Sequence, residues 1–277
     1  MATIGGMNSR EALLTLARYA KGQWGMVTSA QATAAGVNYM QLKRMTEAGL
    51  LERVGTGVYL MIGGQASAAR GQAVKVAWLR LDPAVAAWER PQLGPNSAVV
   101  SHGSAAVLLQ LSDLIVPNVE FIVTRRRTSR IPGVKLHQHA LASYEITWAD
   151  GLPVTTATRT LTDLLAARVD ARHAGSFLAD ALDQRMVNAS YVIEQAAPFA
   201  AAYGCRPGDG QGLIELLLDQ TRATPGMRDR EQTVADLARE LLRMTDDQLS
   251  ALRSLAIAAR EPAVAALLPR TGNHRNL

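Results

Sequence analysis

Cysteine is nearly absent from this 277-residue sequence, in which Cys205 is the only one. A single cysteine excludes a disulfide framework and a cysteine-based zinc site, and it is typical of proteins in a reducing compartment. Long apolar runs are also missing, because His102, Gln110 and Asp113 interrupt the most apolar stretch, residues 98–116. No basic segment followed by an apolar one opens the chain. We therefore expect a soluble cytoplasmic protein without a membrane partner.

Charged residues are also sparse, at 19% of the chain, yet the net charge is +5. Residues 1–160 carry the positive excess, whereas residues 161–277 are slightly acidic. This asymmetry favours an anionic partner for the front of the chain and a different partner for the back. The apolar fraction of 48% is enough to bury a core, which excludes wholesale disorder.

Capping signals divide the first fifty residues into three short helices. In each, a side chain suited to the N-cap precedes Glu or Gln by three residues, the spacing of a capping box. The pairs are Asn8 with Glu11, Thr28 with Gln31, and Asn38 with Gln41. Two strand-like runs follow, residues 50–54 and 58–62, joined by Gly55-Thr56-Gly57, which suits a hairpin turn. This order predicts a winged helix-turn-helix in a domain of residues 1–64.

The third helix carries the predicted DNA-reading face. At 100° per residue, Leu42, Met45 and Thr46 face the other helices, and the cations Lys43 and Arg44 face away. Lysine and arginine can pair with guanine or phosphate, and glutamine with adenine. A merely solvated helix face is the alternative. The candidate DNA-binding residues are Asn38, Tyr39, Met40, Gln41, Lys43 and Arg44 in the helix, with Arg53 and Thr56 in the hairpin.

The stretch from Val27 to Leu60, VTSAQATAAGVNYMQLKRMTEAGLLERVGTGVYL, resembles the N-terminal domain of AbiEi-type antitoxins. Two later segments, VVSHGSAAVLLQL at 99–111 and DGLPVTTATRTLTDLLAA at 150–167, are similar to the effector region of that family. The typical wing has an arginine where this chain has Thr56. The resemblance implies a non-enzymatic repressor of its own operon, without a cofactor, whose partners are promoter DNA with inverted repeats and a nucleotidyltransferase-like toxin or its target.

Residues 65–277 form the second predicted domain, an α+β effector region with strands over about 119–155 and mostly helices after 156. A pair of glycines, Gly63-Gly64, predicts a hinge between the domains, so we expect residues 65–277 to fold and counter the toxin alone. An arginine-rich turn contains Arg125, Arg126, Arg127 and Arg130. Four guanidiniums so close repel one another, which favours contact with DNA or with an acidic partner.

The sequence predicts no catalytic residue and no metal ligand. Neighbours on a helix diverge by 100°, so Ser101 is expected to cap a helix and not to bond His102. We interpret His137 and His139 as a surface or half-buried pair without a metal, and Arg159 with Asp163 as a local i, i+4 ion pair.

Two rival functions remain open. One is a ligand-responsive winged-helix regulator without a toxin. The other is a nuclease behind a winged helix, which requires carboxylates and a lysine around magnesium. The sequence has four lysines, and neither Glu-x-Lys nor Asp-x-Lys precedes Lys135, which disfavours the nuclease.

Overall fold

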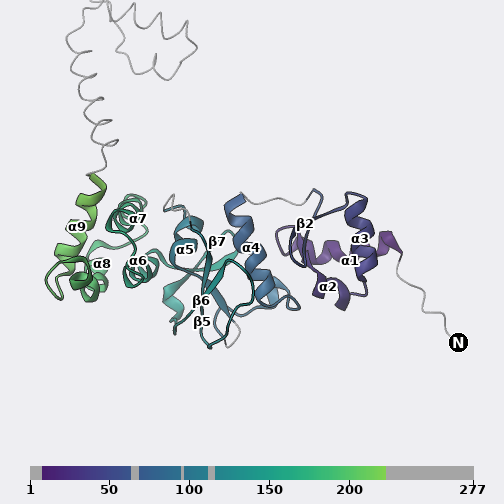
Figure 1. Cartoon of the computed structure of the whole chain (residues 1–277), viewed down its shortest axis with the longest axis horizontal. Coiled ribbons are helices and arrows are strands. Elements are labelled where there is room, and N and C mark those ends of the chain that lie inside the picture. The colour runs from purple at the N-terminus through teal and green to yellow at the C-terminus, as the bar shows by residue number, and fades with distance from the viewer. Residues whose placement is uncertain (1–7, 64–68, 95–96, 112–115, 223–277) are drawn as a thin grey trace, which may run out of the picture. The chain divides into compact units, whose positions relative to one another are not determined.

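A computed structural model describes residues 8–63, 69–94, 97–111 and 116–222 (Figure 1). The described residues up to residue 221 belong to one compact unit. The predicted hinge from Gly64 onward, the predicted break at residues 224–226 and the expected helical end of the chain lie outside the described residues. No helix within the described ranges is long and apolar enough to cross a membrane.

The N-terminal part consists of three helices and a small antiparallel sheet. The helices are α1 (Ser9–Lys21), α2 (Ser29–Ala34) and α3 (Tyr39–Glu47), and the strands are β1 (Met26–Thr28), β2 (Leu51–Gly55) and β3 (Val58–Met61), in the order β1-β3-β2. Reciprocal capping boxes start α2 at Thr28 and α3 at Asn38, as their spacing predicts. Strand β1, which the sequence did not signal, ties the segment after α1 to β3.

A mixed five-stranded sheet forms the centre of the effector region. Its strands are β4 (Ala98–Val100), β5 (Val119–Val123), β6 (Val134–Gln138), β7 (Ile146–Ala149) and β8 (Leu152–Thr155), in the order β6-β5-β4-β8-β7. The pairs β5–β6 and β4–β8 are parallel, and β4–β5 and β7–β8 are antiparallel. The β4–β8 pairing brings together the two segments of the effector region that resemble the antitoxin family.

Helices pack on this sheet and continue the chain. They are α4 (Ala69–Leu81), α5 (His102–Leu108), α6 (Ala157–Ala166), α7 (Ala171–Asp183), α8 (Ala189–Ala196) and α9 (Gly210–Arg222), with 3-10 turns at Ala87–Glu89, Ser143–Glu145 and Ala197–Tyr203. The mostly helical character after residue 156 is thus found as far as residue 222. In α9, Leu213 and Leu217 are buried in the main core, so this apolar stripe serves packing.

The two parts share one hydrophobic core across the predicted boundary at residue 64. Met26, Val58 and Leu60 of the N-terminal sheet pack in the same cluster as Val74 and Val76 of α4. A separate small core, which includes Leu16, Val37, Leu42 and Met45, lies within the three N-terminal helices. The division into domains 1–64 and 65–277 therefore stays a prediction, and a truncation at residue 64 would expose apolar surface of α4.

Buried amides reinforce this junction. Gln23 and Gln31 are fully buried and exchange two hydrogen bonds of 2.9 Å between their side-chain amides. Gln31 also donates to the carbonyl of Val85 at 3.2 Å, and the amide of Ala87 donates to Gln23 at 2.9 Å. Thr28, the N-cap of α2, donates its hydroxyl to the carbonyl of Pro83. The residues that begin α2 thus also hold the segment that follows α4.

Lys75 supplies the strongest polar link. Its side chain is fully buried, and Nζ lies 2.7 Å from Asp150 Oδ2 and 5.2 Å from the ring centroid of Trp24. The indole of Trp24 donates to the backbone carbonyl of Asp150 at 3.0 Å. A Cβ at Gly151 would lie 2.7 Å from that indole nitrogen, so the β7–β8 turn requires glycine there. Periodicity gave no signal for this contact, because its members lie far apart in the sequence.

We expect Asp150→Ala to lower the free energy of unfolding by about 1–3 kcal/mol, because it removes the carboxylate that neutralises a buried ammonium and places alanine in the left-handed backbone of Asp150, at φ +51°. The half-exposed position of Asp150 keeps this loss below that of a fully buried pair. Urea denaturation followed by tryptophan fluorescence and by circular dichroism measures it. Adding Lys75→Met should recover part of the loss, and a double variant less stable than Asp150→Ala would contradict the assignment.

Candidate functional site

Helix α3 presents the polar face that its sequence predicts. Leu42 and Met45 are buried, whereas Lys43 and Arg44 are exposed. Lys43 Nζ lies 3.7 Å from Glu47 in an exposed i, i+4 pair, which is a weak contact in water. Tyr39 and Met40 are 68% and 52% exposed, so large side chains stand in solvent at the start of the helix.

The side chains of Asn38 and Gln41 serve the helix itself. Asn38 Oδ1 accepts from the backbone amide of Gln41 at 2.9 Å, and Gln41 Oε1 accepts from the amide of Asn38 at 2.8 Å. A bidentate contact of Gln41 with adenine uses both the oxygen and the nitrogen of its amide. Since the oxygen holds the cap, that contact requires the cap to open.

In the β2–β3 hairpin, Arg53 and Thr56 are exposed, and Arg53 Nε donates a long hydrogen bond of 3.4 Å to the carbonyl of Gly55.

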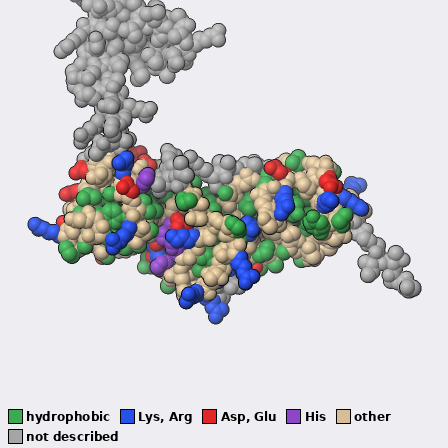
Figure 2. Space-filling view, in the orientation of Figure 1, with side chains coloured by type: hydrophobic (Ala, Val, Ile, Leu, Met, Phe, Trp, Pro, Cys, Tyr) green, Lys and Arg blue, Asp and Glu red, His purple; other side chains and the backbone are tan. Residues whose placement is uncertain are grey.

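The arginines of the turn between β5 and β6 differ in their exposure to solvent. Arg125, Arg126 and Arg130 are exposed, and Figure 2 shows cationic side chains gathered near the ends of these strands.

Arg127 points inward and differs from its neighbours. One of its guanidinium nitrogens is buried and has no hydrogen-bond partner among the described residues. Burial lowers the pKa of Arg127, against the attraction of Asp82. Burial, opposed by Asp82 and assisted by the charge of Arg127, also lowers the pKa of Arg90 to about 10. Arg127 is therefore a poor candidate for a partner contact, unlike the other three.

The structure corrects the interpretation of Ser101 and His102. Ser101 occupies the N-cap position of α5 but makes no side-chain capping bond; its hydroxyl lies 2.9 Å from His102 Nδ1. The prediction was wrong because it placed His102 on a regular helix. His102 has φ +52°, in the left-handed region, where the 100° rotation between neighbours does not hold. Both residues are buried.

His102 lies in a group of titratable side chains at the edge of the second sheet. Its ring stacks on that of His137, with centroids 3.7 Å apart and planes 16° from parallel. His137 Nε2 lies 3.2 Å from Glu120 Oε1, and Lys135 Nζ lies 3.6 Å from the same oxygen. His139 is exposed just beyond the strand, and His137 is half-buried. Figure 2 shows histidine side chains at the surface beside charged ones.

The environment separates the proton affinities within this group. Burial, together with the charge of His137, lowers the pKa of His102 to about 4, so this ring is neutral near pH 7. Burial alone would raise the pKa of Glu120, but the hydrogen bond with His137 and the surrounding cations hold it below its ordinary value. A neutral imidazole thus stacks beside one that is bonded to a carboxylate.

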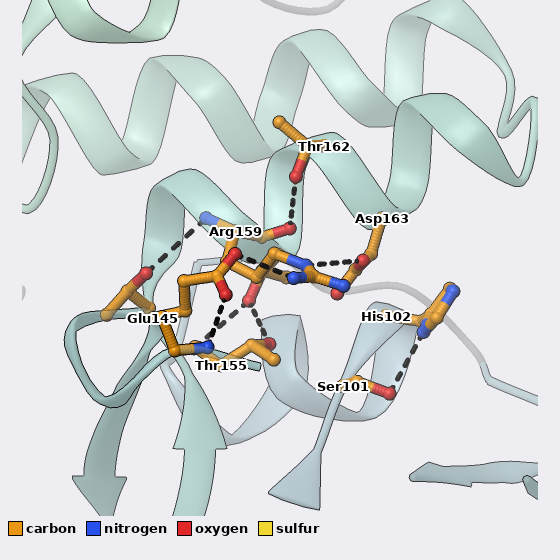
Figure 3. A network of polar contacts seen from close by, with 10 residues as sticks. Ser101, His102, Glu145, Thr155, Arg159, Thr162 and Asp163 are labelled. Atoms are coloured by element: carbon orange, nitrogen blue, oxygen red, sulfur yellow. Dashed lines mark hydrogen bonds and ion pairs between the residues drawn. The ribbon is translucent and has the colours of Figure 1, made fainter. Parts of the chain in front are cut away.

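Arg159 organises the second polar group, on α6. Figure 3 shows it between Glu145 and Asp163, with bonds of 2.6 Å and 2.9 Å. The predicted pair of Arg159 and Asp163 is therefore found, and Glu145 extends it. Asp163 Oδ2 is buried without a hydrogen-bond partner among the described residues, and burial raises the pKa of this carboxyl even though Arg159 opposes the change.

No group of three or more His, Cys, Asp or Glu side chains within the described residues is arranged to hold a metal ion. The stacked histidines and Glu120 join α5, β5 and β6, and the Arg159 network joins α6 to the 3-10 turn Ser143–Glu145. They show perturbed proton affinities. Helix α3 lies in a helix-turn-helix that is followed by a hairpin. This arrangement is typical of DNA-binding regulators.

A match to a known protein family supports this interpretation. Residues 15–62 match the family described as "Transcriptional regulator, AbiEi antitoxin". This segment runs from α1 to just beyond the β2–β3 hairpin, and it confirms the resemblance drawn from residues 27–60. The match supports a transcriptional regulator. Comparison with curated proteins found no match.

We expect the free energy of unfolding to fall as the pH drops from about 6.5 to about 4, by up to about 3 kcal/mol. The unfolded chain binds a proton at His102 over this range, whereas the folded chain does not, because its pKa is near 4. Denaturation curves at several pH values measure the slope.

His102→Asn should flatten that slope, since asparagine tolerates the left-handed backbone and does not titrate. The control is His173→Asn, at an exposed position on α7, which should leave the slope unchanged. A slope equally steep in His102→Asn and in the wild type would refute this account.

Proposed function

We propose that this chain is a DNA-binding antitoxin that represses its own operon and counteracts a nucleotidyltransferase-like toxin. The observation that carries the DNA-binding part is the exposed face of α3, where Lys43 and Arg44 stand in solvent on a helix fixed from beneath by Leu42 and Met45. The toxin part follows from the AbiEi match over residues 15–62, whose description joins regulator and antitoxin.

On this proposal α3 enters the major groove and the β2–β3 hairpin acts as the wing. Arg53 is the hairpin cation available to a phosphate, while Thr56 at the turn contributes a hydroxyl in place of the arginine of typical wings. Lys43 and Arg44 contact bases or phosphates, and exposed Tyr39 and Met40 lie against the DNA backbone or a thymine methyl group. A promoter with inverted repeats would bind two copies of the chain.

The protein acts without catalysis on this proposal, in the cytoplasm, and needs no cofactor. The perturbed groups around His102 and Asp163 stabilise the effector region, since each serves a bond between secondary-structure elements. Within the described residues, the carboxylate that Lys135 contacts is Glu120 on the neighbouring strand, which does not favour the nuclease alternative.

Replacing Lys43 and Arg44 together by alanine should weaken binding to the promoter without unfolding the chain. If either residue makes a bidentate contact with guanine, its loss costs about 1–3 kcal/mol and relaxes specificity at one base. Fluorescence anisotropy with the DNA upstream of the gene measures the affinity. The matched control removes two exposed cations of α1, Arg18 and Lys21. If both double variants bind the promoter with equal affinity, α3 is not part of the DNA interface.

The arginine-rich turn can be assigned by salt dependence. Each phosphate neutralised contributes roughly −0.9 to the slope of log affinity against log salt concentration. We expect the triple variant Arg125→Ala, Arg126→Ala and Arg130→Ala to give a shallower slope if the turn contacts DNA. If it contacts the toxin, the slope stays and co-expressed toxin is no longer neutralised. Arg127 is left in place because it packs inward. A variant that matches the wild type in both assays shows that the turn is only solvated.

A further inference from the structure

A cleft of about 730 Å³ opens between the β2–β3 hairpin, α4 and the first residues of β5 and β6. Its volume falls within the range of small-molecule sites, about 300–1,000 Å³. Neither the proposed DNA contacts of α3 nor the polar groups around His102 and Arg159 use this cleft.

Aliphatic residues form about half of the lining, and charged or polar side chains form most of the rest. The cleft has no aromatic lining residue. Its aliphatic side chains include Val54, Val76, Ala77, Val119, Ile131 and Val134. Two guanidiniums reach it from separate elements, Arg53 from β2 and Arg80 from α4. Within the part of the chain that the structure describes, neither forms an ion pair with a carboxylate. Glu52 is the single acidic residue of the lining, so the cleft carries one net positive charge.

This lining selects the chemistry of an occupant. A single carboxylate head matches one net positive charge and accepts paired hydrogen bonds from a guanidinium fork. An apolar body matches the aliphatic residues of the lining, and Thr56 and Gln72 supply its uncharged hydrogen-bonding side chains. A nucleotide fits less well, because its several phosphate charges exceed those of the lining and its sugar would lie against aliphatic surface.

The cleft also adjoins the DNA-binding part. Gly55 of the hairpin packs directly on α4: a Cβ there would lie 2.6 Å from Val76 Cγ1. The hairpin and α4 thus form two walls in fixed contact, and Arg53 belongs both to the cleft and to the proposed wing. A ligand that holds Arg53 in the cleft removes it from a DNA phosphate.

We propose that the cleft binds a small organic carboxylate with an apolar body, and that this ligand weakens binding to promoter DNA by engaging Arg53 and Arg80. The part that concerns DNA rests on the proposed function, whereas the binding part does not. Because coupling between two sites is reciprocal, bound DNA must lower the affinity for the ligand by the same factor.

The test uses the full chain and two pairs of probes. Isothermal titration calorimetry compares 2-naphthoate with its neutral isostere 2-naphthamide, and decanoate with decanamide. We expect at least one acid to bind saturably with a dissociation constant below about 1 mM. Its amide should bind about tenfold more weakly or not at all. Arg80→Gln should weaken the acid by about tenfold and leave the amide unchanged. The control, Arg18→Gln, removes an exposed arginine outside the cleft and should bind both as the wild type does.

A second measurement concerns the promoter. Adding the bound acid should lower the affinity of the wild type for the promoter and leave that of Arg80→Gln unchanged. Equal binding of acid and amide, or no saturable binding of either acid, overturns the proposal. Binding without an effect on the promoter overturns the coupling. Weaker promoter binding by Arg80→Gln in the absence of any acid makes the cleft a DNA contact and also overturns it. A wild type that binds the acid but no promoter refutes the proposed function instead.

Discussion

The buried ammonium of Lys75 is the constraint on which the arrangement of this protein depends. A charge in the interior is tolerated only where an opposite charge and hydrogen bonds replace water. Asp150 provides that charge from the β7–β8 turn, and Trp24, reaching across from the segment after α1, contacts both Lys75 and Asp150. Three segments that are distant in the sequence must therefore come together in one geometry. The N-terminal helices cannot rotate against the central sheet without exposing the ammonium of Lys75 to solvent or separating it from Asp150.

Around that link the junction is built from polar groups with more than one role. Gln31 completes the capping box of α2, pairs with Gln23 and holds Val85. The apolar residues beside it, Met26 and Leu60, belong to the same core as α4. Hydrogen bonds fix the orientation, and apolar burial supplies the stabilisation, at about 25 cal/mol per Å² removed from water. The position of α3 relative to the effector region is thus set by structure that lies outside the DNA-reading face.

Local signals in the sequence were sufficient for the three N-terminal helices and the hairpin, and insufficient for strand β1 and the site chemistry. The capping spacings at Thr28 and Asn38 place α2 and α3, because a cap is an interaction between near neighbours. Strands β1 and β4 have three residues each, too short to show a period, and pairing partners define them. The contact between Ser101 and His102 was missed because a helical rule was applied to a residue with positive φ. The stacking of His102 on His137, like the pairing of Lys75 with Asp150, joins segments whose proximity only the fold creates.

The double role of the α2 cap also bears on modularity. Helix-turn-helix domains are often treated as cassettes that can be exchanged between regulators. Here Thr28 and Gln31 are bonded to Pro83 and Val85, and Gln23 is bonded to Ala87. A graft of residues 1–63 onto another effector region would leave these buried amides without acceptors and donors unless the segment 83–87 moved with them. The transferable unit in this protein is accordingly discontinuous in sequence, and an engineered chimera would have to carry both pieces.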